Sequence, residues 1–146
     1  MHTIMRDEFR HTITTDQASS RGALWTGRTM SGIAVVFLTL DAIGKLLQVP
    51  PVVDGTRQLG YPVEVIFGLG VTLMSCVLVY VVPRTAMLGA VLLTGYLGGA
   101  VATHVRVANP LLTHTLFPTY VAALLWGGLM LRDARLRAFV PWRRQS

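Results

Sequence analysis

The stretch Thr39-Leu-Asp-Ala-Ile-Gly-Lys-Leu-Leu-Gln-Val-Pro50 carries two opposite charges, Asp41 and Lys45, inside an apolar run long enough to cross a bilayer. A lone aspartate near the bilayer centre costs roughly 2.5–3.5 kcal/mol on insertion scales, so a charge at that depth is normally paired and turned inward. The i,i+4 spacing puts both side chains on one helical face. We therefore expect Asp41 to point into the bundle, either paired with Lys45 or held protonated. Lys45 has the alternative of extending to the outer interface.

The composition is that of a chain whose solvent is largely lipid. Of the 146 residues, 52% are hydrophobic and 14% are charged, whereas a soluble domain carries about 25% charged residues. The net charge is +6, but nine of the thirteen Lys and Arg residues lie in the two polar ends of the chain. Basic residues that flank apolar runs are a topology signal of membrane proteins, so we expect lipid and not nucleic acid as the partner.

Four apolar runs are long enough to be membrane helices, and each is bounded by proline, charge or polar turns. A run such as the first, at ~1.5 Å per residue, is roughly 31 Å long and matches the hydrocarbon thickness. The predicted spans are 29–49, 63–82, 86–105 and 115–131, with a loop at 50–62.

These spans predict an all-α fold, an integral membrane four-helix bundle with both termini cytoplasmic. The predicted organisation is a flexible polar N-terminal tail (1–27), the four-span bundle (28–131) and a basic C-terminal tail (132–146). Within the third span, Gly95 and Gly99 form a small-x-x-x-small pair that favours close helix approach.

The predicted topology brings the titratable side chains of the spans to one end of the bundle. Asp41 lies near the middle of the first predicted span, about two turns deeper than the others. The residues expected at the outer end are Lys45, Glu64, His104, Arg106 and His114, and Tyr61 in the loop suits the same interface. The outer end of the predicted bundle is therefore polar, and the opposite end is largely apolar.

Several kinds of chemistry receive little support from the residue spacing. Glu64, His104 and His114 provide ligand types for a metal or haem, but no H-x-x-x-H or E-x-x-H pair is present, so we expect no metal site. The single cysteine, Cys76, lies in an apolar segment and is expected to be a packing residue. No covalently held cofactor is predicted, because no c-haem or iron–sulfur spacing occurs.

Short motifs in a fixed order resemble the DoxX-like family of small four-helix bacterial membrane proteins over roughly residues 30–131. The motifs are Gly44-Lys-Leu46, Leu59-Gly-Tyr-Pro62, Pro83-Arg-Thr85 followed by Leu88-Gly-Ala90, and Gly99-Ala-Val-Ala-Thr-His104. The resemblance implies a multi-pass protein of the bacterial inner membrane. Some relatives are linked to redox work: one group resembles the small subunit of a thiosulfate:quinone oxidoreductase, and others are tied to oxidative-stress or quinone-resistance complexes. Lys45 and His104 match the family pattern best, whereas Asp41, Glu64, Arg106 and His114 have less support from it.

Three functional hypotheses follow, and they differ on whether the protein is an enzyme. The first is an accessory redox component that binds quinone or another lipophilic ligand in the outer half of the bundle. The second is a non-catalytic scaffold subunit that docks a membrane or soluble redox partner, or a second copy of itself. The third is cofactor-free acid–base chemistry on a lipid-like substrate, with Asp41 and Glu64 as paired carboxylates. The candidate catalytic residues are Asp41, Lys45, Glu64 and His104, and the candidate ligand-binding residues are Lys45, Tyr61, His104, Arg106 and His114.

Overall fold

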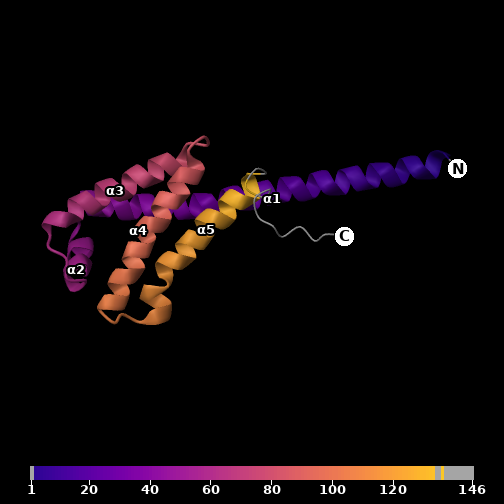
Figure 1. Ribbon diagram of the computed structural model, residues 1–146. Helices are drawn as coiled ribbons and strands as arrows, with labels where there is room; N and C mark the ends of the chain where they lie inside the picture. The colour runs from indigo at the N-terminus through magenta and orange to yellow at the C-terminus, as the bar shows by residue number, and fades with distance from the viewer. Residues whose placement is uncertain (1, 134–135, 137–146) are drawn as a thin grey trace.

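A computed structural model of the protein describes residues 2–133 and 136, with side chains from residue 21 onward. The described part of the chain is helical and contains no strand. Its elements are α1 (His2–Leu46), α2 (Pro50–Gln58), α3 (Glu64–Val81), α4 (Ala86–Arg106), a π-helical turn η1 (Leu111–Thr115) and α5 (Phe117–Arg132) (Figure 1). The segments long and apolar enough to cross a membrane are Arg21–Leu46, Glu64–Val81, Ala86–Arg106 and Leu111–Arg132. The predicted all-α membrane bundle is confirmed.

The four long helices pack as antiparallel neighbours around a continuous apolar core. α1 lies between α3 and α5, and α4 contacts both α3 and α5 on the other side. The side chains with the least exposure come from all four helices: Leu38, Ala42, Leu73, Tyr80, Leu93 and Leu125. The first part of α1 extends past the other helices at the end where α5 finishes (Figure 1). Because the number of spans is even, the start of the first span and the end of the fourth lie on the same side of the bundle. The assignment of that side to the cytoplasm stays a prediction.

Glycine permits the closest contact between α1 and α5. A Cβ atom on Gly128 would lie 2.8 Å from the carbonyl oxygen of Gly27 and 2.8 Å from the amide nitrogen of Ser31. The predicted role of Gly95 and Gly99 in close helix packing is wrong, because no atom lies within 4 Å of a Cβ built on either residue. Both glycines border a cavity instead.

Two segments differ from the sequence-based expectation in their local structure. Residues 1–27 were expected as a flexible tail, but α1 is helical from His2 and continues without a break into the first span. No proline precedes Pro50, so nothing in this segment interrupts the helical backbone hydrogen bonds. The predicted loop 50–62 contains α2, because Pro50 and Pro51 fit the first turn of a helix, where their missing N–H groups are not needed.

A buried polar cluster joins three helices at the end of the bundle near the chain termini. The Tyr80 hydroxyl donates to the carbonyl oxygen of Leu125 at 2.9 Å and accepts a hydrogen bond from the Ser31 hydroxyl at 2.9 Å. Arg132 was assigned to the C-terminal tail, but it is the last residue of α5, and its guanidinium lies 5.2 Å from the centre of the Tyr80 ring. Most of the predicted tail, 134–135 and 137–146, lies outside the described residues.

Candidate functional site

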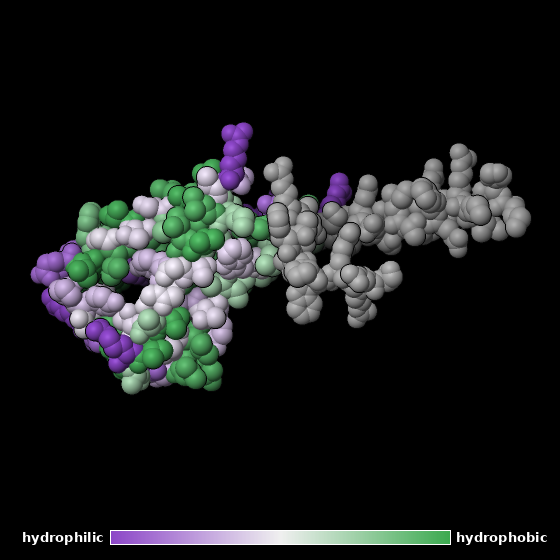
Figure 2. Space-filling view, viewed as in Figure 1, coloured by the Kyte–Doolittle hydropathy of each residue, from purple (hydrophilic) through white to green (hydrophobic). Residues whose placement is uncertain are grey.

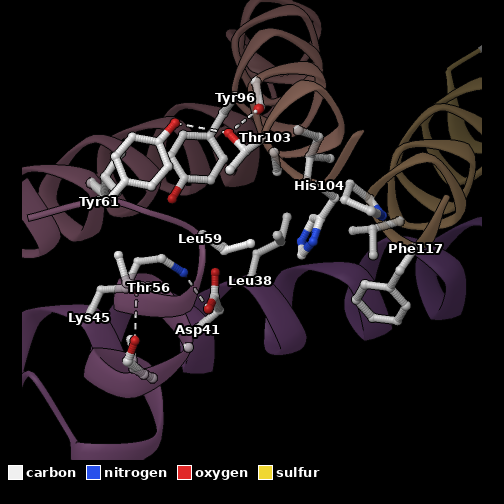
Figure 3. A pocket seen from close by; sticks show the side chains of 18 of the residues that line it. Leu38, Asp41, Lys45, Thr56, Leu59, Tyr61, Tyr96, Thr103, His104 and Phe117 are labelled. Carbon is white, nitrogen blue, oxygen red and sulfur yellow. Dashed lines mark hydrogen bonds and ion pairs between the residues drawn. The ribbon is translucent and has the colours of Figure 1, made fainter. Parts of the chain in front are cut away.

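A cavity of about 500 Å³ lies in the half of the bundle away from the chain termini. Its walls come from the last turns of α1, one face of α2, the second half of α4 and the start of α5. Most of the lining is apolar, and the polar side chains stand at a few positions: Asp41, Lys45, Thr56, Tyr61, Tyr96, Thr103 and His104 (Figure 3). This size and this lining are typical of sites for small organic ligands.

Asp41 and Lys45 form an ion pair on the α1 wall of the cavity. The Lys45 ammonium donates to Asp41 Oδ1 at 2.5 Å, and the two side chains are 15% and 31% exposed. The predicted inward pairing is confirmed, and Lys45 does not extend to the interface. The ammonium has three N–H donors and uses one of them in this bond, so two donors remain for a ligand.

The depth of the ion pair is smaller than expected. Helix α1 ends at Leu46, whereas the predicted span was 29–49. Asp41 therefore lies roughly 8 Å from the end of the helix, at ~1.5 Å per residue, and not near its middle. The physical reason is that a tight turn after Leu46, with Gln48 at φ +49°, closes the helix before Pro50 is reached.

Tyr61 is held at the rim of the cavity by two neighbours on α4. Its hydroxyl lies 2.9 Å from Thr103 Oγ1, which itself donates to the carbonyl oxygen of Gly99 at 2.9 Å. Because the single Thr103 proton is used in that bond, Tyr61 is the donor to Thr103, and its oxygen lone pairs remain free to accept. Gly60, at φ +78°, provides the left-handed turn that brings Tyr61 to this place.

Arg106 stabilises this turn and does not line the cavity. Its guanidinium donates to the carbonyl oxygen of Leu59 at 2.6 Å and lies 5.7 Å from the centre of the Tyr61 ring. The distance to the ring is typical of a cation–π contact. The structure thus places this candidate ligand-binding residue behind Tyr61, where it positions the tyrosine.

His104 lines the cavity, and Asn109 determines which of its ring nitrogens carries a proton. The amide nitrogen of Asn109 lies 2.8 Å from His104 Nδ1. An amide NH₂ group is only a donor, so Nδ1 accepts in this orientation and the proton of the neutral imidazole lies on Nε2. His104 therefore presents an N–H donor through its other ring nitrogen.

We expect an Asn109→Asp substitution to change the protonation of this ring. A carboxylate in place of the amide accepts from Nδ1, so Nδ1 becomes protonated in the variant and is unprotonated in the original protein. The ¹⁵N chemical shifts of labelled histidine report the state of each ring nitrogen, and His104→Asn identifies the signal. A protonated Nδ1 in the original protein would contradict this assignment.

Two polar cavity residues on α4, Tyr96 and Thr103, were not predicted from the sequence because they look like ordinary residues of a membrane span. Tyr96 lines the cavity and has no hydrogen-bond partner for its hydroxyl among the described residues. Thr103 is 8% exposed and anchors Tyr61. The available signal was helical periodicity: Tyr96, Thr103 and His104 follow the i, i+7, i+8 pattern of one helix face.

Glu64 and His114 lie at the same end of the bundle but outside the cavity lining. Glu64 is exposed in the first turn of α3, where a carboxylate is favourably placed at the positive end of the helix dipole. His114 is exposed in η1; its ring centre lies 6.2 Å from that of His104, and its Nδ1 lies 2.9 Å from the Thr113 hydroxyl. In the described part of the chain, no three His, Cys, Asp or Glu residues are grouped as metal ligands.

The comparison with protein families decides which group the chain represents. The model of the DoxX-like family matches residues 29–128. The chain belongs to the DoxX-like family. All cavity-lining residues of this DoxX-like protein, from Phe37 to Val121, fall inside the matched range, and the first part of α1 falls outside it. Searches of curated proteins and of solved structures gave no match.

Proposed function

We propose that this DoxX-like protein binds a quinone, or a lipid-soluble molecule with similar carbonyl oxygens, in the cavity. The observation that carries the proposal is the set of unused donors around an apolar space: the Lys45 ammonium, the Tyr96 hydroxyl and the His104 Nε2–H group. A ring with acceptor oxygens would satisfy these donors and fill the apolar remainder.

The arrangement of the donors supports a flat ligand with oxygens on opposite sides. Figure 3 shows the Tyr96 side chain reaching from α4 toward the ion pair on α1, and His104 further along α4. The hydroxyl of Tyr96 is the clearest sign of a missing partner, because a half-buried phenol normally makes a hydrogen bond. Lys45 with Tyr96 would hold one oxygen, and His104 would hold the other.

A bound quinone would supply two-electron, two-proton exchange. Asp41 would hold the Lys45 ammonium in place, and the remaining ammonium protons would donate hydrogen bonds to one quinone oxygen. Electrons would come from a redox partner protein in or at the membrane. The basic ends of the chain favour the bacterial inner membrane with both termini cytoplasmic, which places the cavity in the outer half.

Removal of single donors tests the proposal. We expect Tyr96→Phe to weaken binding of a short-chain benzoquinone by about 3–10-fold, since a neutral hydrogen bond contributes ~0.5–1.5 kcal/mol. Lys45→Met should weaken it by more than about tenfold, since hydrogen bonds from charged groups contribute ~1.5–3 kcal/mol. Binding is measured by quenching of tryptophan fluorescence in detergent micelles, with thermal unfolding as the check on folding.

Tyr120→Phe is the matched control, because Tyr120 is 49% exposed on α5 and does not line the cavity. It should bind the quinone as the original protein does. A protein that binds no quinone, or a Tyr96→Phe variant with unchanged affinity, would contradict the proposal.

The placement of the carboxylates does not favour acid–base chemistry by Asp41 and Glu64, because only Asp41 lines the cavity. The scaffold hypothesis remains the second candidate. It is supported by the contacts of Arg106 with Leu59 and Tyr61, in which a charged residue serves the fold. Under this alternative the protein would co-purify with a stoichiometric partner and without quinone.

A further inference from the structure

The cavity extends to the edge of the bundle at two lateral sides, and the two sides differ. Residues that both line the cavity and are exposed mark its edges. On the α1–α5 side these are Phe37 and Phe117, and on the α4 side they are Gly95 and Gly99.

Aromatic packing closes the α1–α5 side. The rings of Phe37 and Phe117 meet edge to face, with their centres 5.2 Å apart. The two side chains are 41% and 42% exposed, so their outer surfaces face the surroundings while their inner surfaces line the cavity. Edge-to-face contacts of this kind hold aromatic rings together.

The α4 side is open. Nothing lies within 4 Å of a Cβ atom built on Gly95 or on Gly99, so the wall there consists of bare backbone with free space beside it. In the space-filling view the surface is hollowed between α2 and α4 (Figure 2). Leu69 of α3 and Leu59 are half-buried members of the same lining.

The opening lies at the depth of the hydrocarbon. Gly99 and Gly95 precede Arg106, the last residue of α4, by roughly 10 Å and 16 Å along the helix. The exposed neighbours Val91 and Leu92 are apolar, as lipid-facing residues are. The opening therefore connects the cavity with lipid tails.

We propose that the ligand carries one long apolar chain, which leaves the cavity over Gly95 and Gly99 and continues into the bilayer. This inference rests on the proposed function and specifies its ligand: a head group with acceptor oxygens, joined to a membrane-anchored chain. A cavity of about 500 Å³ has room for a ring and the first part of a chain. A longer chain needs an exit, and the glycine face is the open lateral side.

The test compares two ligands on two leucine variants. The ligands are benzoquinones with the same ring, one with a short alkyl group and one with a long isoprenoid chain. Gly99→Leu puts a side chain into the opening, whereas Gly98→Leu adds the same side chain next to it, where Gly98 is exposed and outside the lining. Both sites have free space for a Cβ, and leucine is a better helix former than glycine, so both variants are expected to fold.

We expect Gly99→Leu to weaken binding of the long-chain quinone by about tenfold, since the chain loses contacts of several CH₂ groups. The short-chain quinone should lose clearly less affinity than the long-chain quinone in Gly99→Leu, and Gly98→Leu should leave both ligands within about twofold. Equal losses for both ligands in Gly99→Leu, or no loss for either, would overturn the exit route while leaving the head-group site in place. If the original protein binds neither quinone, the proposed function itself fails.

Discussion

Replacement of Gly128 by leucine is expected to lower the free energy of unfolding by about 3 kcal/mol or more. A side chain at this position would meet backbone atoms of Gly27 and Ser31, and backbone cannot move aside as a side-chain end can. The α1–α5 contact would have to open, and with it the hydrogen bond between Ser31 and Tyr80 that joins α1 to α3. Unfolding by titration with a denaturing detergent, followed by circular dichroism, measures the loss.

Two other glycines provide graded controls for Gly128. Gly127→Leu would meet the terminal Cε methyl group of Met30, which is flexible and can rotate away, so we expect a loss of about 1 kcal/mol or less. Gly32→Leu points into open space on the exposed face of α1 and should change stability by no more than ~0.5 kcal/mol. Equal effects of the three substitutions would contradict the assignment of the close contact to Gly128.

Lys45→Met is expected to destabilise the fold by about 2–3 kcal/mol, and a second substitution, Asp41→Leu, is expected to restore it. Without Lys45 the carboxylate of Asp41 has no partner and cannot extend to the interface. The cost is below the ~3–5 kcal/mol of a fully buried pair, because Asp41 remains 31% exposed. The double variant Asp41→Leu/Lys45→Met has no unpaired charge and should be within ~1 kcal/mol of the original protein.

The reverse single variant should behave differently, and this asymmetry is the specific part of the prediction. In Asp41→Leu the freed lysine, next to the last residue of α1, can extend toward the head groups, so we expect a loss of about 1 kcal/mol. The same detergent titration measures all three variants as a double-mutant cycle. If Lys45→Met, Asp41→Leu and the double variant were all equally stable, the pair would have no role in the fold.

The sequence predicted the helical membrane bundle because each span carries its own signal. Apolar runs of sufficient length, bounded by Pro50, Pro83 and Pro110, are local features that need no tertiary information. The pairing of Asp41 with Lys45 was predictable for the same reason, since an i,i+4 pair meets within a single helix. Tyr61 and His104 were also recognised as candidates, and both line the cavity.

The features that could not be predicted from the sequence depend on contacts between different helices. Whether a glycine is packed against a backbone or beside a cavity depends on the neighbouring helix: Gly95 and Gly99 have the small-x-x-x-small spacing yet face open space, whereas Gly128 is pressed against α1. Helix α2, which was predicted as a loop, lines the cavity with one face, and that contact too depends on the neighbouring helices.

The chain by itself therefore determined the number of spans, the all-α class and the local ion pair, because these follow from residue type and helical period along one segment. Only the tertiary structure decided which polar groups share the cavity. Tyr96 and His104 line the cavity, whereas Glu64 and Arg106 do not. The reason is that the direction of a side chain depends on how its helix is rotated against the neighbouring helices. The donor set that defines the proposed ligand is a property of that rotation.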